Sequence, residues 1–332
     1  MDQLTMSRAP IVPIIGGGPA GMSCALWLHN YGLRPVIVEQ ETALGGMARR
    51  SPYPNEGLLG QPDQSARENA AKFANHIGKL AVETWLGSRP QRLRRENDGF
   101  RLDITFSGQP EVRSLSGPAL VIATGTQFRG EDWLDQIKNA RQLATAGRVH
   151  LGPGAVGERD ADLGTHVAVI GGGDNAFDVS RMLAEKGVHV SLVMRSKSPV
   201  GQPLLVERLR PHQASGMAEL MVGRTVTALE QAGSRIRVRL NDGGEITVDH
   251  VVLLFGYRPN TSEPWIAELA LEKDPRGYLV VDGNMETSRR GVFAVGDVAN
   301  PGHPCIATAI GSGTMAARRI QQLLARQHVP RS

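Results

Sequence analysis

Two glycine-rich turns constrain this chain more than any other feature of its sequence. One turn covers residues 16–21 and follows the apolar segment Ile11–Ile15, and the other covers residues 171–176 and follows Val167–Ile170. In such a turn the first glycine allows a tight bend, the second lets backbone N–H groups approach a pyrophosphate, and a small third residue lets the next helix pack on the strand. One turn alone is a weak signal, but two in the same strand-to-helix context predict two dinucleotide-binding sites.

Strand and helix patterns alternate along both halves of the chain. The first half is expected to form helices over 22–28 and 65–80 and strands over 36–39, 101–106 and 119–122. The second half is expected to form a helix over 177–184 and strands over 188–194, 235–240 and 251–254. A last helix is expected to open at Gly311-Ser312-Gly313 and to run to Leu324. This alternation indicates an α/β fold with doubly wound sheets, in which one architectural unit occurs twice.

Charged residues near the ends of the second strands indicate which dinucleotide each turn binds. Glu39 stands roughly twenty residues after the first turn, where a carboxylate meets the ribose hydroxyls and repels a 2′-phosphate. The matching segment after the second turn, Met194-Arg195-Ser196-Lys197, has no carboxylate. Arg195 and Lys197 together suit a 2′-phosphate, which favours NADPH over NADH. Two solvated surface cations are an equally supported interpretation.

Composition and charge exclude several classes of protein. The 332 residues are enough for two domains and carry a net charge of only +4, so a nucleic-acid partner is not expected. No apolar run approaches the length that spans a bilayer, so no membrane segment is expected. Cys24 and Cys305 lie in no C-x-x-C or metal-ligand spacing, so no metal site is expected, and the scarcity of cysteine fits a reducing cytoplasm. The basic stretch Arg89–Arg95 is expected on a solvated edge strand, with docking of an acidic partner as the alternative.

Taken together, these motifs resemble the two-dinucleotide-binding flavoproteins of the pyridine nucleotide-disulfide oxidoreductase superfamily, and most closely the low-molecular-weight thioredoxin reductases. The resemblance covers nearly the whole chain and adds Ala123-Thr124-Gly125, residues 256–260 and Gly296-Asp297 to the motifs above. It implies two Rossmann-like domains of the three-layer ββα type, with the NAD(P)H domain inserted into the FAD domain. The implied FAD domain is residues 1–126 with 259–332, and the implied NAD(P)H domain is residues 127–258. A homodimer is implied as well.

The resemblance also assigns residues to each cofactor. Asp297 would accept a hydrogen bond from a ribitol hydroxyl of FAD, and an N-cap or turn role is the alternative for this residue. The full set implied for FAD is Gly16, Gly18, Pro19, Ala20, Gly21, Glu39, Gly46, Met47, Asn55, Ala123, Thr124, Gly125, Gly296, Asp297, Ile306 and Ala307. The set implied for NAD(P)H is Gly171, Gly173, Asp174, Asn175, Ala176, Arg195, Lys197 and Gly256.

The mechanism that the resemblance implies is hydride transfer from nicotinamide C4 to flavin N5. The positive end of the helix opening at Gly311-Ser312-Gly313 would stabilise the negative charge near flavin N1. Thioredoxin reductases then use a C-x-x-C pair just before the second turn, but the matching residues 149–157 contain no cysteine, which excludes that relay. Cys24 is expected to pack as a small hydrophobe. Cys305 falls beside the flavin in the family pattern, so packing and a mixed-disulfide or charge-transfer role both stay open, and no other residue is assigned as catalytic.

These inferences predict an FAD-dependent NAD(P)H oxidoreductase that passes electrons to an external acceptor. A ferredoxin- or flavodoxin-type carrier, a quinone, a small electrophile, dioxygen and an external disulfide are all open as the acceptor. A flavin monooxygenase is an alternative, although the further glycine-and-histidine fingerprint of those enzymes is absent. A flavin- or NAD(P)-binding regulatory protein without turnover is another.

Overall fold

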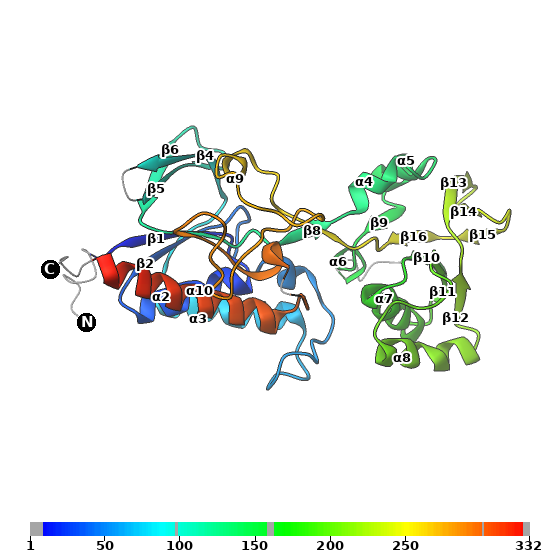
Figure 1. Ribbon diagram of the computed structural model, residues 1–332. Helices are drawn as coiled ribbons and strands as arrows, with labels where there is room; N and C mark the ends of the chain where they lie inside the picture. The colour runs from blue at the N-terminus through cyan, green and yellow to red at the C-terminus, as the bar shows by residue number, and fades with distance from the viewer. Residues whose placement is uncertain (1–8, 97–98, 158–162, 301, 328–332) are drawn as a thin grey trace. The chain divides into compact units, whose positions relative to one another are not determined.

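The computed structural model describes residues 9–96, 99–157, 163–300 and 302–327. Contacts divide the chain into two compact units, one of Met1–Gln127 with Arg258–Ser332 and one of Phe128–Tyr257, so the second unit is an insertion within the first along the chain (Figure 1). The chain passes from one unit to the other through β8 (Thr126–Phe128) and returns through β17 (Tyr257–Pro259), and these two strands pair with each other.

The first unit is built around a five-stranded parallel sheet of order β18-β7-β1-β2-β3. Its central strands β1 and β2 pair from Ile11 opposite Arg34 to Ile15 opposite Val38. Parallel strands are covered on both faces, which is why these segments are apolar at nearly every position rather than alternating. The strands are β1 (Ile11–Ile15), β2 (Arg34–Val38), β3 (Glu83–Trp85), β7 (Leu120–Ile122) and β18 (Val292–Ala294).

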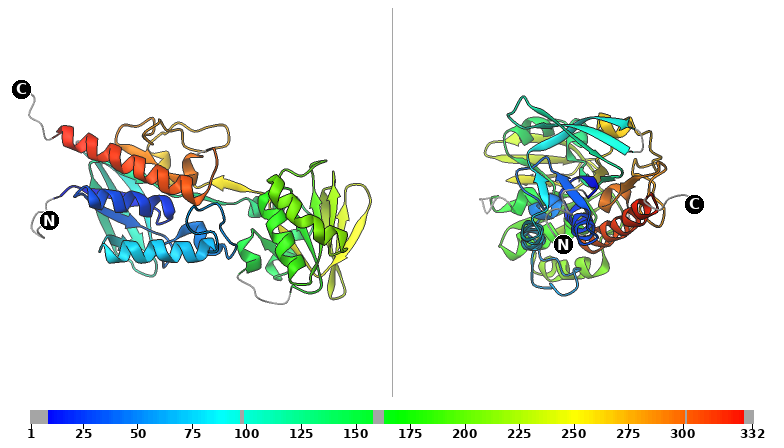
Figure 2. Two further views of the ribbon diagram at one scale, coloured as in Figure 1. Left: turned by 90° about the horizontal axis from the view of Figure 1, so that it is seen from below. Right: turned by 90° about the vertical axis from the view of Figure 1, so that its left-hand side faces the viewer.

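Two different layers cover the faces of this sheet (Figures 1 and 2). Helices α2 (Pro19–Asn30), α3 (Ala66–Lys79) and α10 (Ile306–Gln327) lie on one face, where Ile14 and Phe293 belong to their shared core. The antiparallel sheet β4 (Ser88–Glu96), β5 (Gly99–Phe106) and β6 (Val112–Gly117) covers the other face, with Leu102 and Ile104 in the core. The unit also contains α9 (Pro264–Ala267) and the short 3-10 helices η1 (Gly46–Arg50) and η2 (Gly296–Ala299).

The predicted helix over 65–80 is confirmed as α3, and its start has a local cause. The Ser65 hydroxyl accepts a hydrogen bond from the Glu68 amide at 3.2 Å, while the Glu68 carboxylate accepts one from the Ser65 amide at 2.8 Å. This capping box satisfies two amides that the first turn of a helix leaves unpaired. Hydrogen bonds from the Ser65 amide, and next from the Ser65 hydroxyl, to the Glu68 carboxylate lower the pKa of Glu68.

The expectation that the last helix opens at Gly311-Ser312-Gly313 is wrong, because α10 begins at Ile306. The two glycines lie inside the helix, and Gly313 lets α10 pack closely against α2. A Cβ on Gly313 would clash with the carbonyl oxygen of Ala20 and would stand 2.9 Å from the amide nitrogen of Cys24. Glycine therefore marks the place where the backbones of α10 and α2 nearly touch, rather than a helix start.

The second unit repeats the three layers of the first. Its parallel sheet has the order β12-β11-β10-β16-β9, and the antiparallel sheet β13-β14-β15 packs on one face. Helix α7 packs on β10, β11 and β12. The strands are β9 (Val149–Leu151), β10 (His166–Ile170), β11 (His189–Met194), β12 (Ala218–Val222), β13 (Val226–Ala232), β14 (Arg235–Leu240), β15 (Glu245–Val248) and β16 (His250–Leu253). The helices are α4 (Gly130–Leu134), α5 (Ala140–Thr145), α6 (Gly154–Gly157), α7 (Asp174–Glu185) and α8 (Pro203–Ala214).

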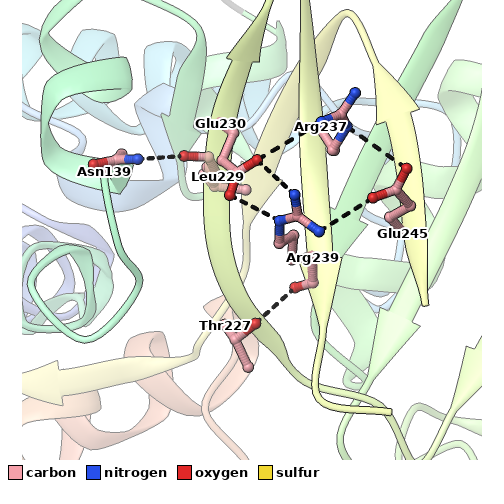
Figure 3. Close-up of polar contacts among 7 residues, drawn as sticks. All are labelled: Asn139, Thr227, Leu229, Glu230, Arg237, Arg239 and Glu245. Atoms are coloured by element: carbon pink, nitrogen blue, oxygen red, sulfur yellow. Dashed lines mark hydrogen bonds and ion pairs between the residues drawn. The ribbon is translucent and has the colours of Figure 1, made fainter. Parts of the chain in front are cut away.

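A ladder of charged residues covers the outer face of β13-β14-β15 (Figure 3). The Arg239 guanidinium donates to Glu230 at 2.7 Å and to Glu245 at 3.3 Å, and Arg237 lies 3.6 Å from Glu245. These pairs lower the pKa of Glu230, chiefly through its hydrogen bond with Arg239. The alternate residues of the same strands, such as Val238, are buried, so the period-2 pattern of β14 decides which face meets the core.

None of the helices in the described ranges is both long and apolar enough to cross a membrane. No group of three or more His, Cys, Asp or Glu residues within those ranges is arranged to hold a metal ion.

Two glycines of α10 give a matched test of its packing. We expect Gly313→Ala to lower the free energy of unfolding by about 1–3 kcal/mol, because the new methyl group overpacks against the backbone of α2. Gly311→Ala should raise it by about 0.5–1 kcal/mol, because a Cβ there meets open space and alanine favours helix. Urea titration followed by circular dichroism measures both. Equal effects of the two substitutions would contradict the close approach of α10 and α2.

Candidate functional site

The first glycine turn joins β1 to α2 and leaves the start of the helix open. Gly18 is the N-cap, and no side chain caps the first-turn amides of α2. A Cβ on Gly16 would stand 2.7 Å from the Ala123 carbonyl carbon, and one on Gly21 would clash with the Gly16 carbonyl oxygen. Strand and helix therefore approach too closely for any side chain at these positions. The amides that remain free at the helix N-terminus suit an anion.

Glu39 lies at this turn, directly after β2, as the sequence predicts. Its side chain is buried, and its two carboxylate oxygens accept hydrogen bonds from the Gly17 amide at 2.7 Å and the Glu41 amide at 2.9 Å. Each carboxylate oxygen has two lone pairs, so one on each oxygen is still available to a hydroxyl. The acid is thus held in one orientation by the glycine turn itself.

A second loop crosses the first turn. The Gly45 amide donates to the Gly17 carbonyl at 2.8 Å, and a Cβ on Gly46 would stand 3.0 Å from the Gly18 Cα. Gly46 and Met47 open the 3-10 helix η1 at this crossing. The structure therefore brings Gly16, Gly18, Pro19, Ala20, Gly21, Glu39, Gly46 and Met47 together at one edge of the parallel sheet.

The segment Ala123-Thr124-Gly125 follows β7 and is held by a residue that the sequence analysis did not assign to the site. Asn260 donates from its side chain to the Thr124 carbonyl at 2.7 Å and from its backbone to the Gly125 carbonyl at 3.0 Å. The Thr124 hydroxyl donates back to the Asn260 carbonyl at 2.9 Å. Asn260 therefore positions this loop. The signal for it in the sequence was its place in residues 256–260, which belong to the family pattern.

Gly296 and Asp297 follow β18 on the same edge of the sheet. The Gly296 amide donates to the Ser312 hydroxyl at 2.9 Å, and a Cβ on Gly296 would stand 2.8 Å from that of Ala20. The Asp297 carboxylate makes no hydrogen bond or ion pair with any residue that the structure describes. Partial burial without a partner disfavours its charged form and raises its pKa. A partly buried acid without a partner is a candidate binding residue.

The other residues implied for FAD lie on the loop after η1 and at the start of α10. The Asn55 amide donates to the Gln64 carbonyl at 2.8 Å, which closes the base of the loop 55–64. Ile306 and Ala307 are the first two residues of α10.

The two cysteines lie in different surroundings. Cys305 directly precedes α10, and its sulfur accepts a hydrogen bond from the Thr308 amide at 3.5 Å, so it caps the helix. Cys24 is fully buried in the core, where burial raises its pKa and keeps the thiol protonated.

These residues fit the dinucleotide that the sequence predicts for the first unit. Free amides at the N-terminus of α2 suit a pyrophosphate, the buried Glu39 suits ribose hydroxyls, and the unpaired Asp297 suits a further hydroxyl. All of them stand after the carboxyl ends of β1, β2 or β18, where open α/β sheets bind ligands.

The second glycine turn joins β10 to α7 in the same way. Gly173 is the N-cap without a side-chain cap, and a Cβ on Gly171 would stand 2.6 Å from the Leu254 carbonyl oxygen. Ala176 is buried and lies 3.4 Å from that position, which explains why a small residue is needed there. Gly256 follows β16 with φ of 80°, a conformation that favours glycine.

Asp174 and Asn175, which follow the turn, have partners that the sequence did not indicate. The Asp174 carboxylate accepts from both the backbone and the side chain of Gln202, at 2.7 and 2.8 Å. The Asn175 side chain donates to the Tyr257 hydroxyl at 3.0 Å. Asp174 therefore fixes the loop after β11 beside the turn, because Gln202 begins α8 from that loop.

Arg195 and Lys197 follow β11 at the carboxyl edge of the second sheet. Both side chains are exposed, and neither has a hydrogen bond or an ion pair with a residue in the described part of the chain. Solvated cations without partners at this edge are available to an anionic group of a ligand.

Comparison with known proteins agrees with this arrangement. The chain is 29% identical over 305 residues to a ferredoxin–NADP reductase of Ignicoccus hospitalis, covering 91% of this chain and 94% of the relative. A ferredoxin–NADP reductase of Limosilactobacillus reuteri is 27% identical over 328 residues, covering 94% of this chain and 93% of the relative.

Solved structures share the fold at lower identity. Thioredoxin reductase of T. acidophilum superposes with a TM-score of 0.81 at 23% identity, covering 96% of this chain and 99% of that one. Thioredoxin reductase of Lactococcus lactis gives the same TM-score and coverage at 21% identity. Both the fold class and the resemblance expected from the sequence are therefore confirmed. The model of the pyridine nucleotide-disulphide oxidoreductase family matches residues 11–318, so the chain belongs to that family.

Proposed function

We propose that this protein is an FAD-dependent NADPH oxidoreductase that passes electrons to a ferredoxin-type acceptor without an internal disulfide. The observation that carries this proposal is the pair of uncapped glycine turns, each at the carboxyl edge of its own parallel sheet, in a chain without a C-x-x-C pair. The two relatives named ferredoxin–NADP reductase span nearly the full chain and support the choice of acceptor.

Residues 1–126 with 259–332 would bind FAD, and residues 127–258 would bind NADPH. The bound pair supplies hydride transfer from the nicotinamide to the flavin and electron transfer onward. In the first unit, the α2 amides would hold the pyrophosphate, Glu39 the ribose hydroxyls and Asp297 a ribitol hydroxyl. Gly46, Met47, Asn55, the loop 123–125 and the start of α10 would complete that site.

The second unit would use the amides after Gly171 for the pyrophosphate of NADPH. Arg195 and Lys197 would hold its 2′-phosphate, since no carboxylate stands at the end of β11 to repel it. Asp174 would act on the loop through Gln202 rather than on the nucleotide. The homodimer and the cytoplasmic location that the sequence suggests stay predictions.

The two cysteines allow only a limited thiol chemistry. Cys24 is buried and protonated, and Cys305 has no second thiol in the sequence with which to form the C-x-x-C relay. Electrons must therefore leave the flavin directly to an external carrier, or through a single thiol.

The acceptor can be identified by following the flavin. We expect anaerobic NADPH to bleach its visible absorbance, and reduced ferredoxin-type carriers to form much faster than reduced disulfides, because this chain has no relay thiols. Stopped-flow reoxidation against ferredoxin, flavodoxin, quinone, an external disulfide and dioxygen measures this. Cys305→Ser should leave the ferredoxin rate unchanged. Fast disulfide reduction that Cys305→Ser abolishes would refute the proposal, and a protein that stays colourless with added FAD would refute it at the first step.

The substitution Asp297→Asn should have opposite effects on FAD binding and on the stability of the FAD-free protein. Asp297→Asn should weaken FAD binding by about tenfold or more, because a charged hydrogen-bond acceptor is lost. The same change should stabilise the FAD-free protein at neutral pH, since the raised pKa means that folding opposes the charged form. This gain is complete while Asp297 is ionised in the folded protein, should shrink as the pH falls through the raised pKa, and should be absent below 3.8, the ordinary pKa of the group.

Flavin fluorescence quenching and thermal melts of the FAD-free protein at several pH values measure the two effects of Asp297→Asn. The exposed Glu268→Gln, in the same unit, is the control and should change neither quantity. Loss of stability in FAD-free Asp297→Asn would count against a ligand role and would favour a structural one.

Arg195 gives a test of nucleotide choice. We expect Arg195→Ala to raise the KM for NADPH by about tenfold and to leave the KM for NADH nearly unchanged, because only NADPH carries the 2′-phosphate. Steady-state kinetics with both nucleotides measure this, with the exposed α8 variant Arg210→Ala as control. An equal rise for both nucleotides would refute the 2′-phosphate role.

A further inference from the structure

The backbone after β12 lies against the backbone after β11. The last residues of the two strands, Met194 and Val222, are paired in the parallel ladder. Beyond them, the Gly223 amide donates to the Ser196 carbonyl at 2.9 Å and the Arg224 amide donates to the Met194 carbonyl at 3.0 Å. Arg224 therefore starts from a backbone position next to the segment that carries Arg195 and Lys197.

The Lys197 side chain also lies close to the segment that precedes Arg224. A Cβ on Gly223 would stand 3.8 Å from the Lys197 Cγ, so the lysine stem runs along the segment that precedes Arg224. Three cations thus come from two adjacent strand ends, and the sequence analysis identified only two of them because Arg224 is 27 residues beyond Lys197.

Arg224 differs from the other two cations because it is oriented. Its Nε lies 2.8 Å from a carboxylate oxygen of Asp242, on the turn between β14 and β15, and both side chains are about two-fifths exposed. The other oxygen of Asp242 accepts the Gly244 amide at 3.0 Å, which fixes the acid within its own turn. A guanidinium has five donors, so the contact at Nε leaves donors for a second anion.

The other arginines near this turn are not available in the same way. Arg237 and Arg239 lie on the outer face of β14, where Glu230 and Glu245 neutralise them (Figure 3). Arg224 pairs with one acid, Asp242, whereas this edge carries three cations, Arg195, Lys197 and Arg224. The edge therefore keeps a net positive charge.

We propose that Arg224 is a specificity residue for the 2′-phosphate of NADPH, acting with Arg195 and Lys197, and that Asp242 limits its strength. This inference rests on the proposed function, and it adds Arg224 as a third residue that would contact the 2′-phosphate. Arginine suits the role because its planar fork can donate two hydrogen bonds to one phosphate. Asp242 holds the guanidinium in place but competes with the phosphate for it.

The test uses equilibrium binding and needs no turnover. The purified full chain is titrated calorimetrically with adenosine 2′,5′-bisphosphate, which carries the 2′-phosphate, and with 5′-AMP, which lacks it. We expect Arg224→Gln to bind the bisphosphate about tenfold more weakly and 5′-AMP unchanged. Asp242→Asn, which leaves Arg224 in place, should bind the bisphosphate about threefold more tightly. Arg210→Gln on α8 is the matched control and should behave as wild type.

The outcomes separate this inference from the function on which it rests. If wild type binds the two nucleotides equally, the preference for NADPH itself is wrong. If wild type discriminates but Arg224→Gln still discriminates as well as Arg210→Gln, only the role of Arg224 is overturned. Should Arg224→Gln fail to fold in a thermal melt, Asp242→Asn decides alone: tighter binding of the bisphosphate supports the proposal, and unchanged or weaker binding overturns it.

Discussion

The direct contact of backbone with backbone at the first glycine turn is the constraint on which this structure depends. Gly21 on α2 rests against the Gly16 carbonyl, and Gly16 rests against Ala123 after β7, with no side chain between them. This contact sets α2 so close to the sheet that its uncapped amides end at the carboxyl edge of the strands. The packing of α2 and the position of its free amides therefore depend on the same contact, because a larger side chain at Gly16 or Gly21 would displace the helix.

The same constraint extends to the last helix. Gly313 lets α10 touch the backbone of α2, and Ser312 beside it accepts the Gly296 amide at 2.9 Å. This bond holds the turn that carries Asp297, so a residue far along the chain is placed at the carboxyl edge of the same sheet as the first glycine turn. Burial of the charged Asp297 opposes folding, and in the proposed FAD site the same charge would serve as a hydrogen-bond acceptor for the ligand.

Charge distinguishes two units that otherwise share their architecture. After the second strand of its parallel sheet, the first unit has Glu39, which its own glycine turn holds by two amides. At the matching place the second unit has Arg195 and Lys197, with Arg224 on the next strand end. An acid repels a 2′-phosphate and a group of cations attracts it. One fold can thus hold two different dinucleotides through a few side chains at a single edge.

The sequence by itself determined the two glycine turns, the α/β class, most of the strands and helices, and the positions of Glu39, Arg195 and Asp297, because these follow from local spacing and apolar periodicity. Only the tertiary structure decided which residues Gly313, Asn260, Gln202 and Arg224 contact. Gly313 was misplaced at a helix start, since a glycine in sequence does not say which backbone it will touch. Asn260 bonds to Thr124, which lies 136 positions earlier in the sequence, and the Arg224 amide bonds to Met194, about 30 positions earlier. Contacts at such separations exist only once the sheets have formed.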